Sequence, residues 1–202
     1  MLRKISTSLV LFAYATSAMA DTPKGPLSLK PTSAWHVDYA DDRCRLARQF
    51  GAGDDLVFAF FDRYGPEESF RLTLAGKPMR VSLDQGEASV QFGPAEGEQK
   101  FAFFKGNLAE RTAIVFSSGE RIGPVTFDER QRLDRAKPED PRIVEPISAE
   151  RKKAVRFLKI GRPLRNEVIL ETGSMNGPLK ALDTCIDNLM TVWGIDVERH
   201  RT

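Results

Sequence analysis

Two cysteines, Cys44 and Cys185, constrain the fold of this 202-residue chain more than any other feature. They are its only cysteines and lie near opposite ends of the chain. A disulfide between them would hold the two ends together and, in the chain-entropy model, would stabilise the fold by about 5 kcal/mol. The alternatives are two buried thiols or a redox pair, and the absence of a Cys-x-x-Cys spacing disfavours a thioredoxin-like role. We favour a structural disulfide, the simplest use of two cysteines in an exported chain.

Residues 1–20 have the three parts of a cleavable secretory signal. Arg3 and Lys4 precede an apolar stretch at 9–13, and residues 18–20 read Ala-Met-Ala, the small-x-small pattern of a cleavage site. The alternative is an uncleaved membrane anchor, which needs about 20 apolar residues, whereas serines and threonines interrupt this segment. We expect cleavage after Ala20, a periplasmic mature chain and no transmembrane span.

The charge balance argues against a nucleic-acid partner. The chain has 30 basic and 28 acidic residues, and cleavage removes Arg3 and Lys4 but no acidic residue, which leaves 28 of each. A neutral mature protein lacks the basic excess of nucleic-acid-binding domains. With 41% hydrophobic and 29% charged residues, the composition is that of an ordinary globular domain.

After an N-terminal extension at 21–34, residues 35–127 predict a β-rich body. Turn-forming residues separate about eight short stretches in which apolar and polar residues alternate, a pattern typical of antiparallel sheets. The expected inward-facing sets include Cys44, Leu46 and Phe50; Leu56, Phe58 and Phe60; Phe70, Leu72 and Leu74; and residues in 79–83, 88–92, 100–104 and 112–116. We expect an α+β fold whose antiparallel body is a sandwich or a partly open barrel.

A different pattern begins after the β-rich body. Residues 128–147 form a charged segment followed by a proline-rich linker. Ser148 can cap a helix that begins at Ala149 and ends before Gly161. This helix is the first element of a predicted helix–strand–helix cap over 148–196.

The remainder of the cap is a strand and a longer helix. Residues 167–172 predict the strand, Asn176 is expected to cap the helix, and Gly194 is a natural stop. The apolar stripe of this helix is Leu179, Leu182, Ile186, Leu189 and Trp193. Cys185 lies on the flank of the stripe, where its thiol can reach a strand beneath the helix. A tail, 197–202, follows the cap.

No motif in the chain predicts a catalytic, cofactor or metal site. The run Glu171-Thr172-Gly173 resembles an aspartic-protease loop, but that chemistry needs two aspartates on Asp-Thr/Ser-Gly loops. His36 and the acids near it match no established metal-ligand spacing. The chain also lacks a Gly-x-Ser-x-Gly elbow and a phosphate-binding glycine loop. We expect a protein that is not an enzyme; the alternative is an atypical envelope hydrolase that uses His36 or Glu171.

Basic residues cluster in and after the first helix of the cap and predict an interaction surface. The candidate residues are Lys152, Lys153, Arg156, Lys159 and, from the β-rich body, Trp35. An envelope protein or an anionic surface would be the partner. The alternative is that the basic residues are the solvated face of a helix.

Three segments resemble the N-terminal region of certain exported bacterial proteins of the energy transducer TonB family. They are 35–51, 70–78 and 173–196, and they include both cysteines. The C-terminal domain that gives the family its name has no counterpart in these 202 residues, so energy transfer is not implied. The resemblance implies an accessory envelope domain that binds or scaffolds another component.

Overall fold

The computed structural model describes residues 25–117, 119–123, 135 and 147–197. Within them lie ten strands: β1 (Leu27–Leu29), β2 (His36–Tyr39), β3 (Cys44–Phe50), β4 (Val57–Arg63), β5 (Arg71–Ala75), β6 (Gln85–Gly93), β7 (Glu98–Leu108), β8 (Arg111–Phe116), β9 (Phe157–Ile160) and β10 (Val168–Leu170). The helices described are α2 (Ala149–Ala154), α3 (Asn176–Val192) and two short 3-10 helices, η1 (Gly53–Asp55) and η2 (Lys77–Met79). These elements confirm the α+β class and the β-rich body.

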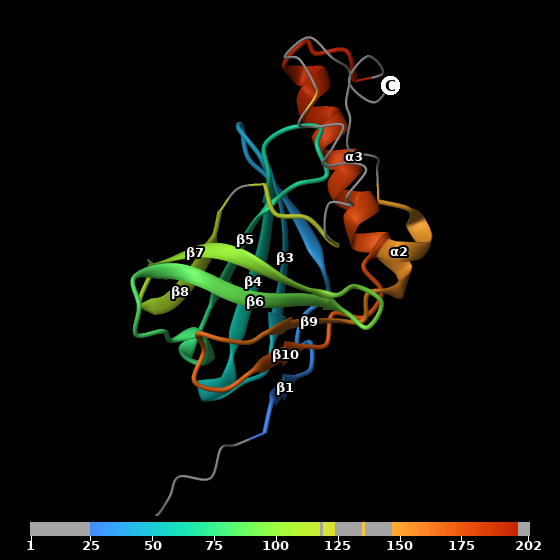
Figure 1. Cartoon of the computed structure of the whole chain (residues 1–202). Coiled ribbons are helices and arrows are strands. Elements are labelled where there is room, and N and C mark those ends of the chain that lie inside the picture. The colour runs from blue at the N-terminus through green and yellow to red at the C-terminus, as the bar shows by residue number, and fades with distance from the viewer. Residues whose placement is uncertain (1–24, 118, 124–134, 136–146, 198–202) are drawn as a thin grey trace, which may run out of the picture.

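All ten strands belong to one sheet, in the order β1-β10-β9-β6-β7-β8-β5-β4-β3-β2. Neighbouring strands are antiparallel except β1 and β10, which are parallel. Figure 1 shows β6, β7 and β9 crossing in front of β3, β4 and β5, so the sheet curves into a half-barrel. The partly open barrel is therefore the correct one of the two predicted forms, because no second sheet packs on the first within the described residues.

The segment expected as an N-terminal extension contributes to the sheet. Leu29 accepts a hydrogen bond from the amide of Glu171 at 3.0 Å, beside β10. The next residue, Lys30, accepts one from the amide of Gly51 at 2.8 Å, at the end of β3. The same stretch of chain thus contacts strands from the two ends of the sheet order and brings them together at one side of the half-barrel.

Aromatic rings fill the interior of the half-barrel. Phe61 and Phe70 meet edge to face with centroids 5.0 Å apart, and Phe70 and Phe92 meet in the same way at 5.9 Å. Phe92 in turn lies 6.4 Å from Phe101. These four side chains are at most 3% exposed, and edge-to-face pairs add to the stabilisation that burial provides.

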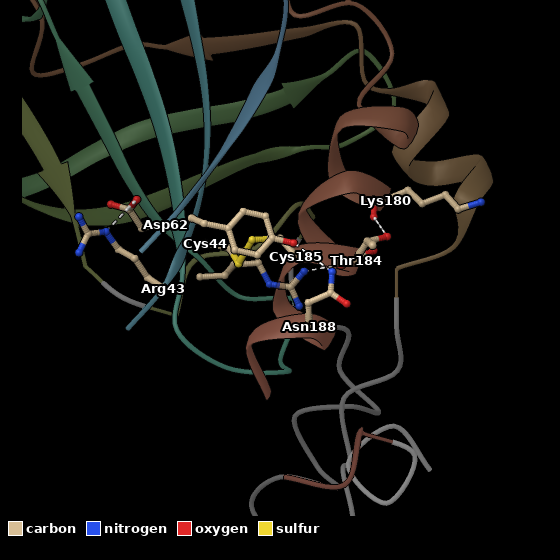
Figure 2. The surroundings of a disulfide bond; sticks show 10 residues. Arg43, Cys44, Asp62, Lys180, Thr184, Cys185 and Asn188 are labelled. Atoms are coloured by element: carbon tan, nitrogen blue, oxygen red, sulfur yellow. Dashed lines mark hydrogen bonds and ion pairs between the residues drawn. A yellow bond between two sulfur atoms is a disulfide. The ribbon is translucent and has the colours of Figure 1, made fainter. Parts of the chain in front are cut away.

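The predicted disulfide is confirmed and attaches α3 to the sheet. Cys44 at the start of β3 bonds to Cys185 in α3, with Cα atoms 6.0 Å apart. Figure 2 shows the bond bridging the gap between the strand and the helix. The buried residues of α3 are Leu179, Leu182, Cys185, Ile186, Leu189 and Met190, so the predicted stripe is correct except for Trp193, which is 43% exposed.

The predicted inward face of the strand after Gly53 is wrong. Val57, Ala59 and Phe61 are buried, and Phe58 and Phe60 lie on the outer face. Residues 57–61 are all apolar, so the sequence has no alternation that marks the buried side. Guanidinium groups cover the outer rings: Arg45 lies 4.8 Å from the Phe60 centroid, and Arg111 lies 5.0 Å from that of Phe58.

The first helix of the cap was predicted too long. The Ser148 side chain accepts a hydrogen bond from the amide of Arg151, as a cap should, but α2 ends at Ala154. Phe157–Ile160 is instead the strand β9, in which Leu158 and Ile160 are buried. Both strands of this region belong to the main sheet, so 148–196 contributes α2, β9, β10 and α3 in that order.

Two smaller predictions also need correction. Residues 79–83 are not a strand; Met79 ends η2, and its side chain is fully buried. Pro78 suits the first turn of η2, because its fixed φ fits a helical start and it has no amide hydrogen that would need a partner there. In addition, Met175 and not Asn176 is the N-cap of α3.

Some predictions fall outside the described residues. These are the leader at 1–20, the segment 128–147 apart from Arg135 and Ile147, and the tail apart from Val197. In the part of the chain that is described, no helix combines the length and the apolar character needed to cross a membrane.

Candidate functional site

The structure separates the five candidate surface residues. Lys153 and Arg156 are exposed, whereas Lys152, Lys159 and Trp35 are each partly buried. Lys159 lies on β9 with its Nζ 3.8 Å from Glu98. The five residues therefore do not form a single exposed patch.

Lys152 belongs to an ion-pair network that joins both helices to the sheet. Its Nζ contacts Glu68 and lies 3.5 Å from Asp183 of α3. Asp183 also accepts a hydrogen bond from Arg63 of β4, whose side chain is 4% exposed. We call Arg63, Asp183, Lys152 and Glu68 the Asp183 network. It gives Lys152 a structural role and fixes α2 beside α3.

Trp35 packs on the core and marks the edge of a polar site. Its ring lies edge-on to Phe50 and Phe61, with centroids 6.0 and 5.9 Å away. Its Nε1 donates to the backbone oxygen of Thr172 at 3.4 Å. The indole is thus an anchor between β4, β3 and the end of β10.

Arg48 reaches the same point from β3. Its side chain lies on the strand face that carries Leu46 and Phe50, and its guanidinium lies 5.3 Å from the Trp35 ring centroid. Nε donates to Ser33 O at 2.9 Å and Nη1 to Thr172 O at 2.8 Å. Burial lowers the pKa of Arg48, because desolvation disfavours the charged form. Among the described residues, no carboxylate forms an ion pair with this guanidinium.

A groove of about 560 Å³ opens where Arg48 emerges. Its lining includes Ser28, Arg48, Arg156, Phe157, Glu171 and Thr172. Arg156 follows α2, and two backbone hydrogen bonds hold it: its amide donates to Gly93 O at 2.7 Å, and its oxygen accepts from Gly173 at 3.0 Å. We call this site the Arg48 groove. It contains the predicted residue Arg156, and Trp35 contacts its Thr172 wall.

Glu171 adds one negative charge to the groove. Its Oε1 accepts a hydrogen bond from Ser28 Oγ at 2.8 Å, across the β1–β10 pair. Neither arginine of the groove forms an ion pair with it within the described chain. The groove therefore has two guanidinium groups and one carboxylate, and no ion pair joins them within the described residues; the apolar residues Phe157 and Ile169 also line it.

Such an arrangement suits recognition of an anion. A guanidinium presents planar donors that match a carboxylate or phosphate, and bonds between charged partners are stronger than neutral ones. A partly desolvated guanidinium also interacts more strongly with an incoming anion than one in bulk water. A donor on the same ligand could pair with Glu171.

The residues named for hydrolysis lie on different elements. His36 is exposed on β2, the last strand in the sheet order, and Glu171 follows β10 near the other end of that order. No described hydrogen bond or ion pair joins them. Within the described residues, no group of three or more histidine, cysteine or acidic side chains is placed to hold a metal ion.

Arg48 is the candidate site residue that the sequence analysis did not identify. In β3 the inward positions are Cys44, Leu46, Arg48 and Phe50, so the arginine occupies a position where an apolar residue is expected. A charged residue at an inward-facing strand position is uncommon unless it has partners. The alternation of inward and outward positions in 44–50 was the sequence signal from which Arg48 could have been identified.

Comparisons of the chain with protein-family models, with curated proteins and with solved structures found no match. The fold and the groove together define the class: a half-barrel domain with a disulfide-anchored helix and a cationic groove at the end of β10.

Proposed function

We propose that the protein is an exported, non-enzymatic domain of the bacterial periplasm that binds or scaffolds an anionic envelope component at the Arg48 groove. The observation that carries this proposal is the pair of guanidinium groups, Arg48 and Arg156, without a carboxylate ion-pair partner among the described residues. An anionic ligand would supply the missing partner.

Three further features support the compartment. The first 20 residues read as a secretory signal, and a single disulfide is compatible with an oxidising environment. The resemblance to the N-terminal region of TonB-family proteins favours an accessory envelope role. Fractionation of cells that express the full chain tests the periplasmic location, because a cytoplasmic location would contradict the proposal.

In this proposal α2 and α3 act as a cap that positions the groove. The Asp183 network fixes α2 against α3 and the sheet, and Arg156 lies two residues beyond the end of α2. Lys152, four residues before Arg156, ties this part of the chain to α3, and the backbone hydrogen bonds of Arg156 to Gly93 and Gly173 hold it beside the groove.

Binding to defined anionic probes tests the function. The probes are vesicles of phosphatidylglycerol, with phosphatidylcholine as the neutral control, and a peptide rich in glutamate, with its glutamine counterpart. We expect at least one anionic probe to bind and its affinity to fall as salt is added. Arg156→Gln should weaken binding about tenfold, the loss expected for one charge-assisted hydrogen bond.

Lys153→Gln is the matched control, since Lys153 is exposed, carries the same charge and lies outside the lining of the groove. It should change the affinity by less than about twofold, as is usual for an exposed charge. If none of the anionic probes binds, or if Arg156→Gln and Lys153→Gln have equal effects, the groove is not the binding site. Turnover of a peptide, ester or glycan substrate that disappears in Glu171→Gln or His36→Ala would instead assign a hydrolase.

A further inference from the structure

A second pocket, at the mouth of the half-barrel, has a different chemistry from the Arg48 groove. Its volume is about 570 Å³, and it lies between the chain that follows η2 and the connection from β9 to β10. Figure 1 shows that connection beside the chain near η2, at the lower end of the sheet. We call this site the mouth pocket. Adjacent residues of β1 line the two sites, Leu27 the mouth pocket and Ser28 the Arg48 groove.

The walls of the mouth pocket are largely apolar. Leu27 and Val168 are paired in the β1–β10 ladder and form one side, and Val81 lies in the lining with them. Val81 and Val168 are 5% and 1% exposed, so they belong to the hydrophobic core as well as to the pocket. An apolar group bound here would pack against side chains of the hydrophobic core.

The rim of the pocket is cationic. Lys77, Arg80 and Arg165 are exposed and lie in the lining, which includes no acidic residue. Lys77 forms an ion pair with Asp54 at 2.5 Å, and the Asp54 side chain is 82% exposed. Arg80 has no side-chain ion pair or hydrogen bond with any described residue. Arg80 therefore brings to the rim a positive charge that forms no ion pair within the described residues.

We infer that the mouth pocket binds an amphiphile that has one apolar chain and an anionic headgroup, either a carboxylate or a phosphate. The chain would lie against Leu27, Val81 and Val168, and the headgroup would contact Arg80 at the rim. The volume is within the roughly 300–1,000 Å³ of ligand pockets, and barrel mouths are frequent ligand sites. This inference does not rest on the proposed function, because the two sites share no lining residue.

Calorimetric titration of the purified mature chain tests the inference. Dodecanoate and dodecyl phosphate, each below its micelle concentration, distinguish the two headgroups. Dodecyltrimethylammonium has the same chain with a positive headgroup, and acetate has the headgroup without the chain. We expect saturable binding of one equivalent of at least one anionic amphiphile and no saturable binding of the two controls. Equal binding of the cationic amphiphile, or no saturable binding of either anionic one, would overturn the inference.

Variants at the rim locate the site. Arg80→Glu should weaken binding at least about tenfold, because it replaces attraction by repulsion at the headgroup. Arg80→Lys should restore most of the affinity, since it restores the charge. The matched control is Arg156→Glu, the same charge reversal in the Arg48 groove; it should leave amphiphile binding within about twofold while it abolishes binding of the anionic probes of the groove.

Amide shift mapping provides a readout independent of affinity. Shifts should concentrate at Leu27, Val81 and Val168 when dodecanoate is added. Shifts centred at Arg156 and Glu171 would place the amphiphile in the groove and overturn the mouth site. An unchanged affinity of the folded Arg80→Glu variant would do the same.

Discussion

Arg48 of β3 lies directly opposite Ala59 of β4, on the inward face of the sheet. The neighbouring inward pairs are Leu46 with Phe61 and Phe50 with Val57, in which both residues are large or branched. Ala59 has the smallest side chain among these partners on β4. The guanidinium of Arg48 reaches the backbone oxygens of Ser33 and Thr172. One inward-facing residue thus ties three parts of the chain together.

Arg48→Met should destabilise the fold by about 2 kcal/mol, because the apolar stem is retained while two backbone oxygens lose a charged donor. Urea denaturation measures the change in the free energy of unfolding. Arg111→Met is the control: its guanidinium is exposed and lies over the Phe58 ring, so its loss should cost less than about 1 kcal/mol. Equal costs for the two variants would contradict the anchoring role of Arg48.

Replacing both cysteines, Cys44→Ser with Cys185→Ser, should lower the free energy of unfolding by about 2–5 kcal/mol, since the bridge closes a loop with a sequence separation of 141. Reduction of the native chain should have a similar effect. Mass measurement after alkylation without reductant should find neither sulfur modified in chain purified from the envelope. Two modified sulfurs would contradict both the bond and the proposed oxidising compartment.

Asp183→Asn should cost about 3 kcal/mol. The substitution removes the negative charge shared by Arg63 and Lys152, and an uncompensated buried charge is strongly destabilising. Asp38→Asn on β2 is an appropriate control, because Asp38 is exposed, and its effect should be close to zero. In a double-mutant cycle with Lys152→Met, the combined cost should be smaller than the sum of the single costs. Additive costs would show that the two residues do not interact.

We expect Glu120 to make the free energy of unfolding depend on pH. Burial raises the pKa of Glu120 from 4.5 to about 7, so the folded chain keeps a proton that the unfolded chain has released. Its contribution to stability is therefore fully present below about pH 4.5 and is lost as the pH rises through about 7. The upper limit of the loss is roughly 3 kcal/mol, and partial exposure reduces it.

Glu120→Gln should remove this loss and flatten the urea midpoint between pH 4.5 and 8. Glu87→Gln, on an exposed residue of β6, should leave the pH profile unchanged. A wild-type profile without a fall across this range would contradict the raised pKa of Glu120.

The sequence predicted those features that depend on local chemistry. The disulfide followed from the number of cysteines, the Ser148 cap from its hydroxyl, and the buried face of α3 from its helical spacing. The alternation of β5 likewise identified Leu72 and Leu74 as buried. In each case the spacing of apolar residues, or a single side-chain type, was enough to predict the feature.

The predictions failed where the spacing of apolar residues fits both a helix and a strand. They also failed where pairing with a neighbouring strand determines which side of a strand is buried. Val57–Arg63 begins with five apolar residues, and only its register with β3 sets which side is buried. Phe157–Ile160 fits a helix arc as well as a strand, and its pairing with β6 and β10 makes it a strand. The Arg48 groove forms because β1, β3 and the end of β10 lie close together in space. These strands are far apart in the sequence, and no local pattern predicts their proximity.

The pairing of Leu27 with Val168 also affects the order in which the molecule can be completed. β10 and β9 lie between β1 and β6 in the sheet, although eight of the described strands precede them in the sequence. Long-range pairing of this kind slows folding and leaves sheet edges open to other chains in the meantime. Until β9 and β10 have formed, β1 therefore has no neighbouring strand in the described sheet, and β6 lacks one of its two.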